Sequence, residues 1–337
     1  MSSSATEFNM PVETASATNP SPEDFAGDAP GQVARRLFHA TRPKFFPASV
    51  LPVLAGTAWG FKVSGAFDPA IFALALLATV CVHAAANVLN DVGDDSGGTD
   101  GLNEDRVYPY TGGSRFIQTG IMPAENMARL GVSLLAVAAI AGMVLLLVKG
   151  PMILAFGLSG VALAVLYSLG PVRLSGLGIG ETAVAVGFGI LPVTGAAWLQ
   201  SGIINGEALL FSLPVSAWVA AILLINEVPD IGPDGATGKR TLPVRLGLNG
   251  TAILYIGIHI FAAAVVVYMT VAGSLPLASP LLPLALLILA FKSAAAIRLG
   301  LQDRDGMRRA IEATLGIHTL GSLWLCGLTL YAVWWPA

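Results

Sequence analysis

Uncharged apolar runs, each about as long as a membrane-spanning helix, cover most of this chain. They occupy 45–61, 69–90, 130–148, 150–172, 182–206, 208–226 and 313–337. The further uncharged run 246–291 is too long for one helix, and turn-forming residues at 273–280 divide it into about 248–272 and 281–300. A spanning helix needs about 20 apolar residues. The sequence therefore predicts an all-α polytopic membrane protein with about nine transmembrane helices.

The composition supports the same class of protein. Hydrophobic residues make up 55% of the chain and charged residues 12%, whereas soluble domains carry about 25% charged residues. Residues 1–34 differ, because they contain five acidic residues, no Lys or Arg, and many Ser, Thr, Ala and Pro. We expect 1–34 to be a disordered acidic tail and 35–337 to be the membrane domain. Cys81 and Cys326 lie in separate apolar runs and predict neither a disulfide nor a Cys-based metal site.

The basic residues predict the orientation of the chain in the membrane. With the N-terminus inside, 15 of the 18 Lys and Arg residues fall in cytoplasmic segments. The loops after the second and sixth expected helices are long and polar, and both lie on that side. We therefore expect a multi-pass protein of the cytoplasmic membrane, with its N-terminus, its active-site loops and the opening of a central cavity on the cytoplasmic side.

Two acidic motifs follow these two helices. In the first, Asn87, Asp91 and Asp94 lie on one helical face, and Asn90 and Asp100 flank them. In the second, Asn226, Asp230 and Asp234 recur every four residues, so we expect a matching stripe at the end of the sixth helix, and Lys239 and Arg240 follow it. Charged residues near the bilayer are costly, so a cation between the two motifs is expected. Mg²⁺ fits best because it favours carboxylates together with substrate phosphate oxygens, which Lys239 and Arg240 also bind well.

The paired motifs resemble the UbiA superfamily of intramembrane prenyltransferases, over nearly the whole chain after the tail. The similarity starts at Thr41-Arg42-Pro43-Lys44 and includes the two motifs just described. Gly112-Gly113-Ser114-Arg115 and Gly178-x-Gly180-Glu181 are similar to the menaquinone-pathway branch, which transfers a polyprenyl chain to 1,4-dihydroxy-2-naphthoate. A departure from the expected pattern is Glu227-Val228-Pro229 before Asp230.

The resemblance implies a prenyl diphosphate and an aromatic acceptor as substrates, and Mg²⁺ as the cofactor. It implies that metal ions are held by Asp91, Asp94, Asp230 and Asp234, with Asp100 as a further acid. Lys239 and Tyr167 would act in catalysis, although an interfacial position is an equal explanation for Tyr167. The residues expected to bind diphosphate, metal or acceptor are Asn87, Asn90, Asn226, Arg115 and Arg240. Arg115 also fits a merely flexible, positively charged loop.

Other functions fit parts of the pattern. The acceptor alternatives are 4-hydroxybenzoate and homogentisate. An ion-coupled transporter also has buried acidic residues, but it places them near the middle of the bilayer and not at helix ends. A CDP-alcohol phosphotransferase requires an Asp-Gly…Ala-Arg run that is absent from the sequence. The lipid bilayer is the expected environment, and neither nucleic acid nor an obligatory protein partner is inferred.

Overall fold

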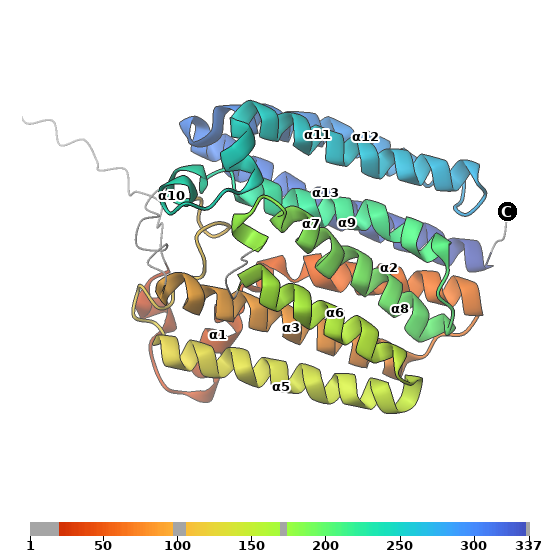
Figure 1. Ribbon diagram of the computed structural model, residues 1–337, viewed down its shortest axis with the longest axis horizontal. Helices are drawn as coiled ribbons and strands as arrows, with labels where there is room; N and C mark the ends of the chain where they lie inside the picture. Colours follow the sequence, from red (N-terminus) through yellow and green to blue (C-terminus); the bar gives the residue numbers. More distant parts are fainter. Residues whose placement is uncertain (1–19, 97–105, 169–173, 335–337) are drawn as a thin grey trace, which may run out of the picture.

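The computed structural model describes residues 20–96, 106–168 and 174–334, and these residues form a bundle of long helices. Figure 1 shows the helices side by side along the long axis of the molecule. The helices are α1 (Pro30–Ala40), α2 (Pro47–Ser64), α3 (Pro69–Ser96), α5 (Ala124–Lys149), α6 (Met152–Ser168), α7 (Gly180–Val184), α8 (Leu191–Ser201), α9 (Gly206–Asn226), α10 (Ile231–Ala236), α11 (Leu242–Val271), α12 (Leu281–Leu299) and α13 (Arg304–Trp334). No strand occurs in these three ranges, as the sequence predicts.

Each of the nine expected membrane ranges coincides with helix over most of its length. Six helical stretches are long and apolar enough to cross a membrane, and one of them, Leu281–Trp334, includes both α12 and α13. The apolar part of α6 is shorter, at Met152–Tyr167. Within the described residues, the helices thus have the length and apolarity of membrane-spanning segments, while the count of nine spans and the side of the cavity stay predictions.

Several helices continue beyond the apolar runs. Helix α3 extends through Ser96, and α13 starts at Arg304, before the expected apolar run at 313. Their additional turns are polar, and helical hydrogen bonding does not require lipid around the helix. The extension of α3 brings Asp91 and Asp94 into a regular helix at the end of the bundle that carries α10 (Figure 1). The expected boundary of the acidic tail, at residue 34, falls within α1.

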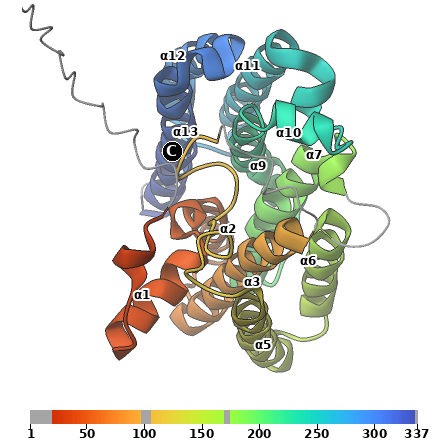
Figure 2. The ribbon, with the colours of Figure 1, turned by 90° about the vertical axis from the view of Figure 1, so that its left-hand side faces the viewer.

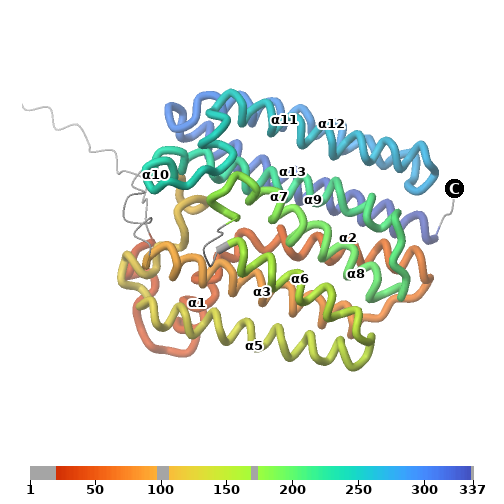
Figure 3. The backbone as a smooth tube through the Cα atoms, in the orientation of Figure 1, coloured from red at the N-terminus to blue at the C-terminus, as the bar shows by residue number. Residues whose placement is uncertain are grey.

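The fifth expected span contains a change of helix type. Helix α7 leads directly into a π-helix at Ala185–Ile190, and α8 then continues to Ser201. Pro192 lies at the start of α8, where its missing N–H removes one donor from the regular α-helical pattern. Helix α11 is also irregular, because Gly247 has a φ of 64° and separates a first short turn from the long helix. The tube in Figure 3 shows this change of direction at the start of α11.

Helix α9 lies at the centre of the bundle, and most of its residues are buried. It packs against α11, α13 and the π-helix, while α3 and α5 pair on one side (Figure 2). Close approach depends on small residues, since a Cβ on Gly189 would overlap Ser216 of α9. The rings of Trp59 and Phe211 stack at 4.6 Å between α2 and α9. These contacts fix α9, and therefore the polar turn that follows it, relative to α2 and the π-helix.

Candidate active site

The first acidic motif is held by hydrogen bonds around the last turns of α3. The side-chain amide of Asn90 donates to Oδ2 of Asp94 at 2.8 Å, so Asn90 orients this carboxylate. The amide of Asn87 instead donates to the carbonyl oxygen of Thr41 at 3.0 Å. Asn87 therefore ties α3 to the segment between α1 and α2, and its expected part in ligand binding stays a prediction.

Asp91 is buried and is bound by two segments that are distant in the sequence. Its Oδ2 accepts a hydrogen bond of 3.0 Å from the backbone N–H of Ser114, and Arg42 lies 3.8 Å from Oδ1. Asp91 Oδ1 has no hydrogen-bond partner among the described residues. This buried oxygen faces the Arg42 guanidinium group but accepts no hydrogen bond from a described residue, so it can also coordinate a cation. Arg42 has no assigned role in the sequence analysis, where the only signal was its place in Thr41-Arg42-Pro43-Lys44.

The loop that carries Ser114 has an unusual backbone. Gly112, Gly113 and Arg115 all have positive φ values, between 65° and 73°. Arg115 is half-buried beside the residue whose N–H binds Asp91. The geometry thus places the Gly112-Gly113-Ser114-Arg115 segment against the first acidic motif, while the ligand expected for Arg115 stays a prediction.

The second acidic motif does not continue along one helix, which corrects the expected stripe at Asn226, Asp230 and Asp234. Helix α9 ends at Asn226, a turn follows, and the short helix α10 begins at Ile231. Pro229 lies in this turn, where it favours the end of a helix because it lacks a donor and restricts the preceding residue. Asp230 is the N-cap residue of α10, and Asp234 lies within that helix.

Lys239 joins the two motifs. Its backbone N–H donates to the carbonyl oxygen of Asp234 at 2.9 Å. Its Nζ lies 3.5 Å from Oδ1 of Asp234 and 3.9 Å from Oδ1 of Asp94. Burial alone would lower the pKa of Lys239, but the carboxylates of Asp94, Asp234 and Asp230 outweigh that effect and raise it. Burial raises the pKa of Asp234, and the Lys239 ammonium group opposes the rise.

Arg240 does not reach these carboxylates in a described contact. Its side chain is exposed, and its backbone N–H donates to the carbonyl oxygen of Gly176 at 2.8 Å. Arg245 adds a hydrogen bond to the carbonyl oxygen of Leu177 at 2.7 Å. The structure therefore uses this segment to hold the loop before α7 against the start of α11.

A second group of polar side chains lies beside the two motifs. Tyr167 lies close enough to Glu227, Glu181, Asp94 and Asp234 to interact electrostatically with all four. A Cβ on Gly180 would lie 3.5 Å from the Tyr167 ring, so the ring packs against the start of α7. Neither Glu181 nor Glu227 has a role predicted from the sequence, although Glu181 ends the Gly178-x-Gly180-Glu181 segment and Glu227 begins Glu227-Val228-Pro229.

Asn226 and Asp100 complete the expected set. Asn226 is half-buried at the end of α9, and its Oδ1 has no hydrogen-bond partner among the described residues. Asp100 lies outside the described residues, so its expected place in the site is not examined by the structure.

The described side chains do not form a complete metal cage. No three His, Cys, Asp or Glu side chains in the described ranges come close enough together to hold a metal ion by themselves. Asp91, whose Oδ1 accepts no hydrogen bond from a described residue, and the carboxylates around Lys239 nevertheless suit Mg²⁺. This ion commonly binds one or two carboxylates and completes its shell with water and phosphate oxygens. The donor set therefore fits a metal ion that arrives with a diphosphate.

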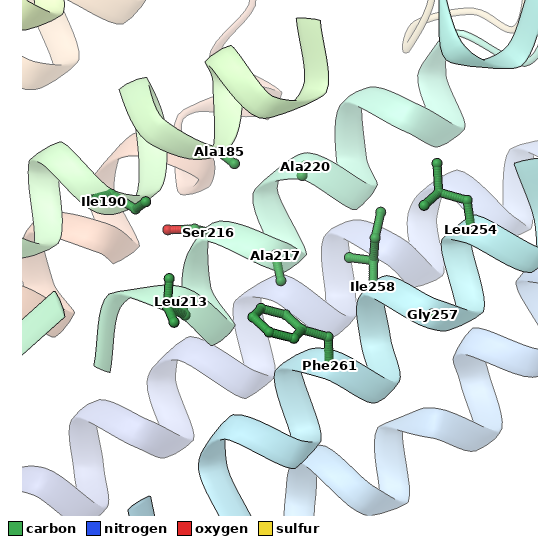
Figure 4. Close-up of a pocket in the computed structure, with 10 residues that line it drawn as sticks. All are labelled: Ala185, Ile190, Leu213, Ser216, Ala217, Ala220, Leu254, Gly257, Ile258 and Phe261. Atoms are coloured by element: carbon green, nitrogen blue, oxygen red, sulfur yellow. The ribbon is translucent and has the colours of Figure 1, made fainter. Parts of the chain in front are cut away.

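An apolar pocket of about 320 Å³ lies between the π-helix, α9 and α11 (Figure 4). Ile190, Leu213, Leu254 and Phe261 are among its lining residues, and Ser216 is the one polar residue in that lining. Ala220 is the pocket-lining residue of α9 that is nearest in sequence to Asn226. At 1.5 Å per residue, about 9 Å of helix separates the two. The pocket thus suits an apolar chain and is distinct from the carboxylate site.

Comparison with known proteins agrees with this geometry. Residues 49–335 match the UbiA prenyltransferase family. The chain is 31% identical over 269 residues to the 1,4-dihydroxy-2-naphthoate octaprenyltransferase of Mycobacterium tuberculosis, covering 78% of this chain and 86% of that relative. It is 32% identical over 214 residues to the enzyme of the same name from Escherichia coli, covering 61% of this chain and 67% of that relative.

Solved structures share the fold. A UbiA homologue from Aeropyrum pernix aligns with a TM-score of 0.62 at 19% identity, covering 85% of this chain and 97% of the homologue. A UbiA homologue from Archaeoglobus fulgidus bound to GPP and Mg²⁺ aligns with a TM-score of 0.58 at 12% identity, covering 87% and 99%. The family match extends over most of the chain and the helical fold agrees with it, so this protein belongs to the UbiA prenyltransferase family.

Proposed function

We propose that this prenyltransferase moves a polyprenyl group from a prenyl diphosphate to 1,4-dihydroxy-2-naphthoate, with loss of the carboxyl group as CO₂, in a Mg²⁺-dependent reaction. Relatives from Mycobacterium tuberculosis, Haemophilus influenzae, Escherichia coli and Mycobacterium leprae, each 30–32% identical to this chain over the aligned residues, carry the name of that activity. The alternative acceptors are 4-hydroxybenzoate and homogentisate, which would be prenylated by the same donor chemistry.

The observation that carries the proposal is the position of Lys239 between Asp94 and Asp234. A cation that already lies between carboxylates from both motifs marks the place where positive charge is needed. A diphosphate that entered with its metal ion would find Lys239 as a hydrogen-bond donor on one side and the Asp motifs on the other. This arrangement supports a single diphosphate site built from both halves of the chain.

The proposed metal ligands are Asp91, Asp94, Asp230 and Asp234, with Asp100 as a further candidate. Bound Mg²⁺ would neutralise the diphosphate and assist its departure as a leaving group. Asn90 holds Asp94 in place, and the Ser114 N–H holds Asp91. Lys239 would stabilise the negative charge that develops on the diphosphate as the carbon–oxygen bond breaks. The aromatic face of Tyr167 would lie near the resulting allylic cation.

The electron-rich ring of the acceptor then forms the new carbon–carbon bond to this cation. With the naphthoate, attack at the carboxyl-bearing carbon is followed by loss of CO₂, which restores aromaticity. The apolar pocket beside α9 offers a surface of the right chemistry for an isoprenoid chain. We place the reaction at the cytoplasmic face of the cytoplasmic membrane, where the polar loops and most of the basic residues are expected.

Carboxyl-labelled 1,4-dihydroxy-2-naphthoate tests the proposal directly. Purified protein given this acceptor, a prenyl diphosphate and Mg²⁺ should release labelled CO₂ together with a prenylated naphthoquinol. With 4-hydroxybenzoate, attack beside the hydroxyl group would release only a proton and no CO₂. Label that stays on the product, or prenylation of hydroxybenzoate alone, would show that the acceptor is wrong while prenyl transfer itself stands.

A further inference from the structure

Two glutamates form a buried acidic pair that the proposed donor site does not use. Glu181 lies in the first turn of α7, and Glu227 is the first residue after α9, the helix against which α7 packs. Their side chains are 4% and 8% exposed, and the two carboxyl groups meet within hydrogen-bonding reach. The pair therefore depends on tertiary packing and not on spacing within one motif.

One carboxyl oxygen of each glutamate lacks a hydrogen-bond partner among the described residues. Glu181 Oε1 and Glu227 Oε2 are both buried, and neither accepts a hydrogen bond from any described residue. None of the ion pairs found within the described ranges includes Glu181 or Glu227. Buried acceptors without donors are unfavourable in a folded protein unless a ligand or water supplies the donor. The pair thus presents two acceptor oxygens to a ligand.

The charge of the pair restricts the chemistry of that ligand. Burial, and then the neighbouring Glu181, Asp234 and Asp230, raise the pKa of Glu227 well above its usual value. The protonated form of Glu227 is therefore favoured, and its proton can lie in a hydrogen bond between the two carboxyl groups. Such a pair repels a carboxylate or a phosphate and favours a neutral hydroxyl group that can donate a hydrogen bond.

The surroundings of the pair place it beside the donor site. Tyr167 interacts with both glutamates and also with Asp94 and Asp234. The Tyr167 ring packs over Gly180, which directly precedes Glu181. A ligand on the pair would therefore lie next to an aromatic face and close to the carboxylates that flank Lys239. An aromatic ring with a hydroxyl group can stack on the Tyr167 ring, donate a hydrogen bond to the glutamate pair and lie close to the donor site.

We propose that Glu181 and Glu227 form the hydroxyl-binding part of the acceptor site, where their unpartnered oxygens accept hydrogen bonds from a phenolic hydroxyl group of the aromatic acceptor. This inference rests on the proposed function and adds the orientation of the acceptor. A hydroxyl group bound to a carboxylate increases the electron density of its ring, which favours attack on a cation. The negative charge of the pair also directs an acceptor carboxylate away from this end of the site.

The acceptor itself provides one arm of the test. The wild-type protein is assayed with 1,4-dihydroxy-2-naphthoate and with its two mono-methyl ethers, which keep the ring but each lose one O–H donor. We expect one of the ethers to raise the acceptor KM on the order of 10-fold to 100-fold, the range for a lost hydrogen bond to a charged group. Equal KM values for the parent compound and both ethers would overturn the proposal without any variant.

Glu181→Gln and Glu227→Gln provide the other arm, with Glu207→Gln as the matched control. Glu207 is exposed in the first turn of α9, where it accepts a hydrogen bond from Ser274. The first two variants should raise the acceptor KM, and their KM values for 1,4-dihydroxy-2-naphthoate and for its methyl ethers should differ less than in the wild type. Their KM for prenyl diphosphate should change less than about 2-fold. The control should behave as wild type. Unchanged discrimination, or a loss confined to the donor KM, would contradict the pair's assigned role.

The test of the glutamate pair can be distinguished from the test of the proposed function. If the protein prenylates a different hydroxylated ring, that ring and its methyl ether replace the naphthoate in both arms. If no prenyl transfer occurs to any ring, the proposed function fails, and equilibrium binding of 1,4-dihydroxy-2-naphthoate to the wild type and the two variants tests the pair. Weaker binding in both variants supports the pair, and equal binding overturns it.

Discussion

Nζ of Lys239 lies 3.9 Å from Oδ1 of Asp94, although Lys239 follows α10 and Asp94 lies in the last turns of α3. The same ammonium group is 3.5 Å from Asp234. One side chain therefore connects the two acidic motifs, which the sequence shows only as separate stripes. The nearby carboxylates raise the pKa of Lys239, so its side chain is a cation that pairs with both motifs.

Lys239→Gln should weaken binding of the prenyl diphosphate. The loss of a charge-assisted hydrogen bond should raise the donor KM on the order of 10-fold to 100-fold, with a smaller effect on the acceptor KM. Steady-state kinetics with each substrate varied in turn measures this difference. Lys149→Gln is the control, because Lys149 ends α5 at the other end of the bundle. A donor KM equal to that of the wild type would show that Lys239 does not bind the diphosphate.

Asp91→Asn, Asp94→Asn, Asp230→Asn and Asp234→Asn should each reduce turnover at least about 100-fold, the scale of lost electrostatic stabilisation. Each change keeps the shape of the side chain and removes its charge, so the helices should remain folded. Asp305→Asn is the control, because Asp305 is exposed in the first turn of α13. Near-normal turnover in any two of the four variants, measured with Mg²⁺ present, would contradict a shared site.

Removal of divalent metal with a chelator should abolish turnover, and added Mg²⁺ should restore it. Burial raises the pKa of Asp234, so protons compete with the metal at a higher pH than they would at an exposed aspartate. The Mg²⁺ concentration for half-maximal turnover should therefore increase as the pH falls toward that raised pKa. Full activity after exhaustive chelation would exclude the metal-dependent reaction, and a requirement that does not change with pH would exclude Asp234 as a ligand.

The sequence predicts the helices well for a physical reason. A chain in lipid must satisfy its backbone hydrogen bonds internally, so apolar runs of sufficient length become helices. The continuation of α3 through Asp94 follows from the helical spacing of Asn87, Asp91 and Asp94 and not from apolarity, because its last turns lie beyond the apolar run. The four-residue spacing of Asn226, Asp230 and Asp234 suggested one helix, but around Pro229 the helix ends at Asn226 and a new one begins at Ile231.

The contacts between distant segments could not be predicted from spacing. Asn87 binds the Thr41 carbonyl oxygen, which only the packing of α3 against the start of α2 brings near. The pairing of Glu181 with Glu227 likewise depends on the contact of α7 with α9. Sequence motifs thus indicated which residues carry charge in the site, and tertiary structure decides which of them orient others and which are left for a ligand.

Gly56→Ala and Gly189→Ala should each destabilise the bundle. A Cβ at Gly56 would overlap the carbonyl oxygen of Val193, and a Cβ at Gly189 would overlap Ser216. Overpacking of this kind costs about 1–3 kcal/mol, which thermal unfolding in detergent can detect. Gly142→Ala on α5 meets no atom within 4 Å and should leave the unfolding temperature unchanged or raised. Equal stability of all three variants would show that α2 and α9 do not approach their neighbours this closely.

Labelling of single cysteines tests the orientation in the membrane. Asn126 is exposed in the first turn of α5, and Ile203 is 52% exposed between α8 and α9, at the opposite end of the bundle (Figure 1). The distribution of basic residues places Asn126 in the cytoplasm and Ile203 outside. Cys81 and Cys326 are buried and free, so both can be replaced by Ala in the background protein.

In right-side-out vesicles, an impermeant maleimide should label Ile203→Cys and not Asn126→Cys, and inverted vesicles should give the reverse. Labelling of both positions from one side would contradict a bundle that spans the membrane, whereas exchange of the two patterns would retain the bundle and reverse its orientation. In the reversed case the acidic motifs would face away from the cytoplasm, and the proposed site would have to take its donor from the other side.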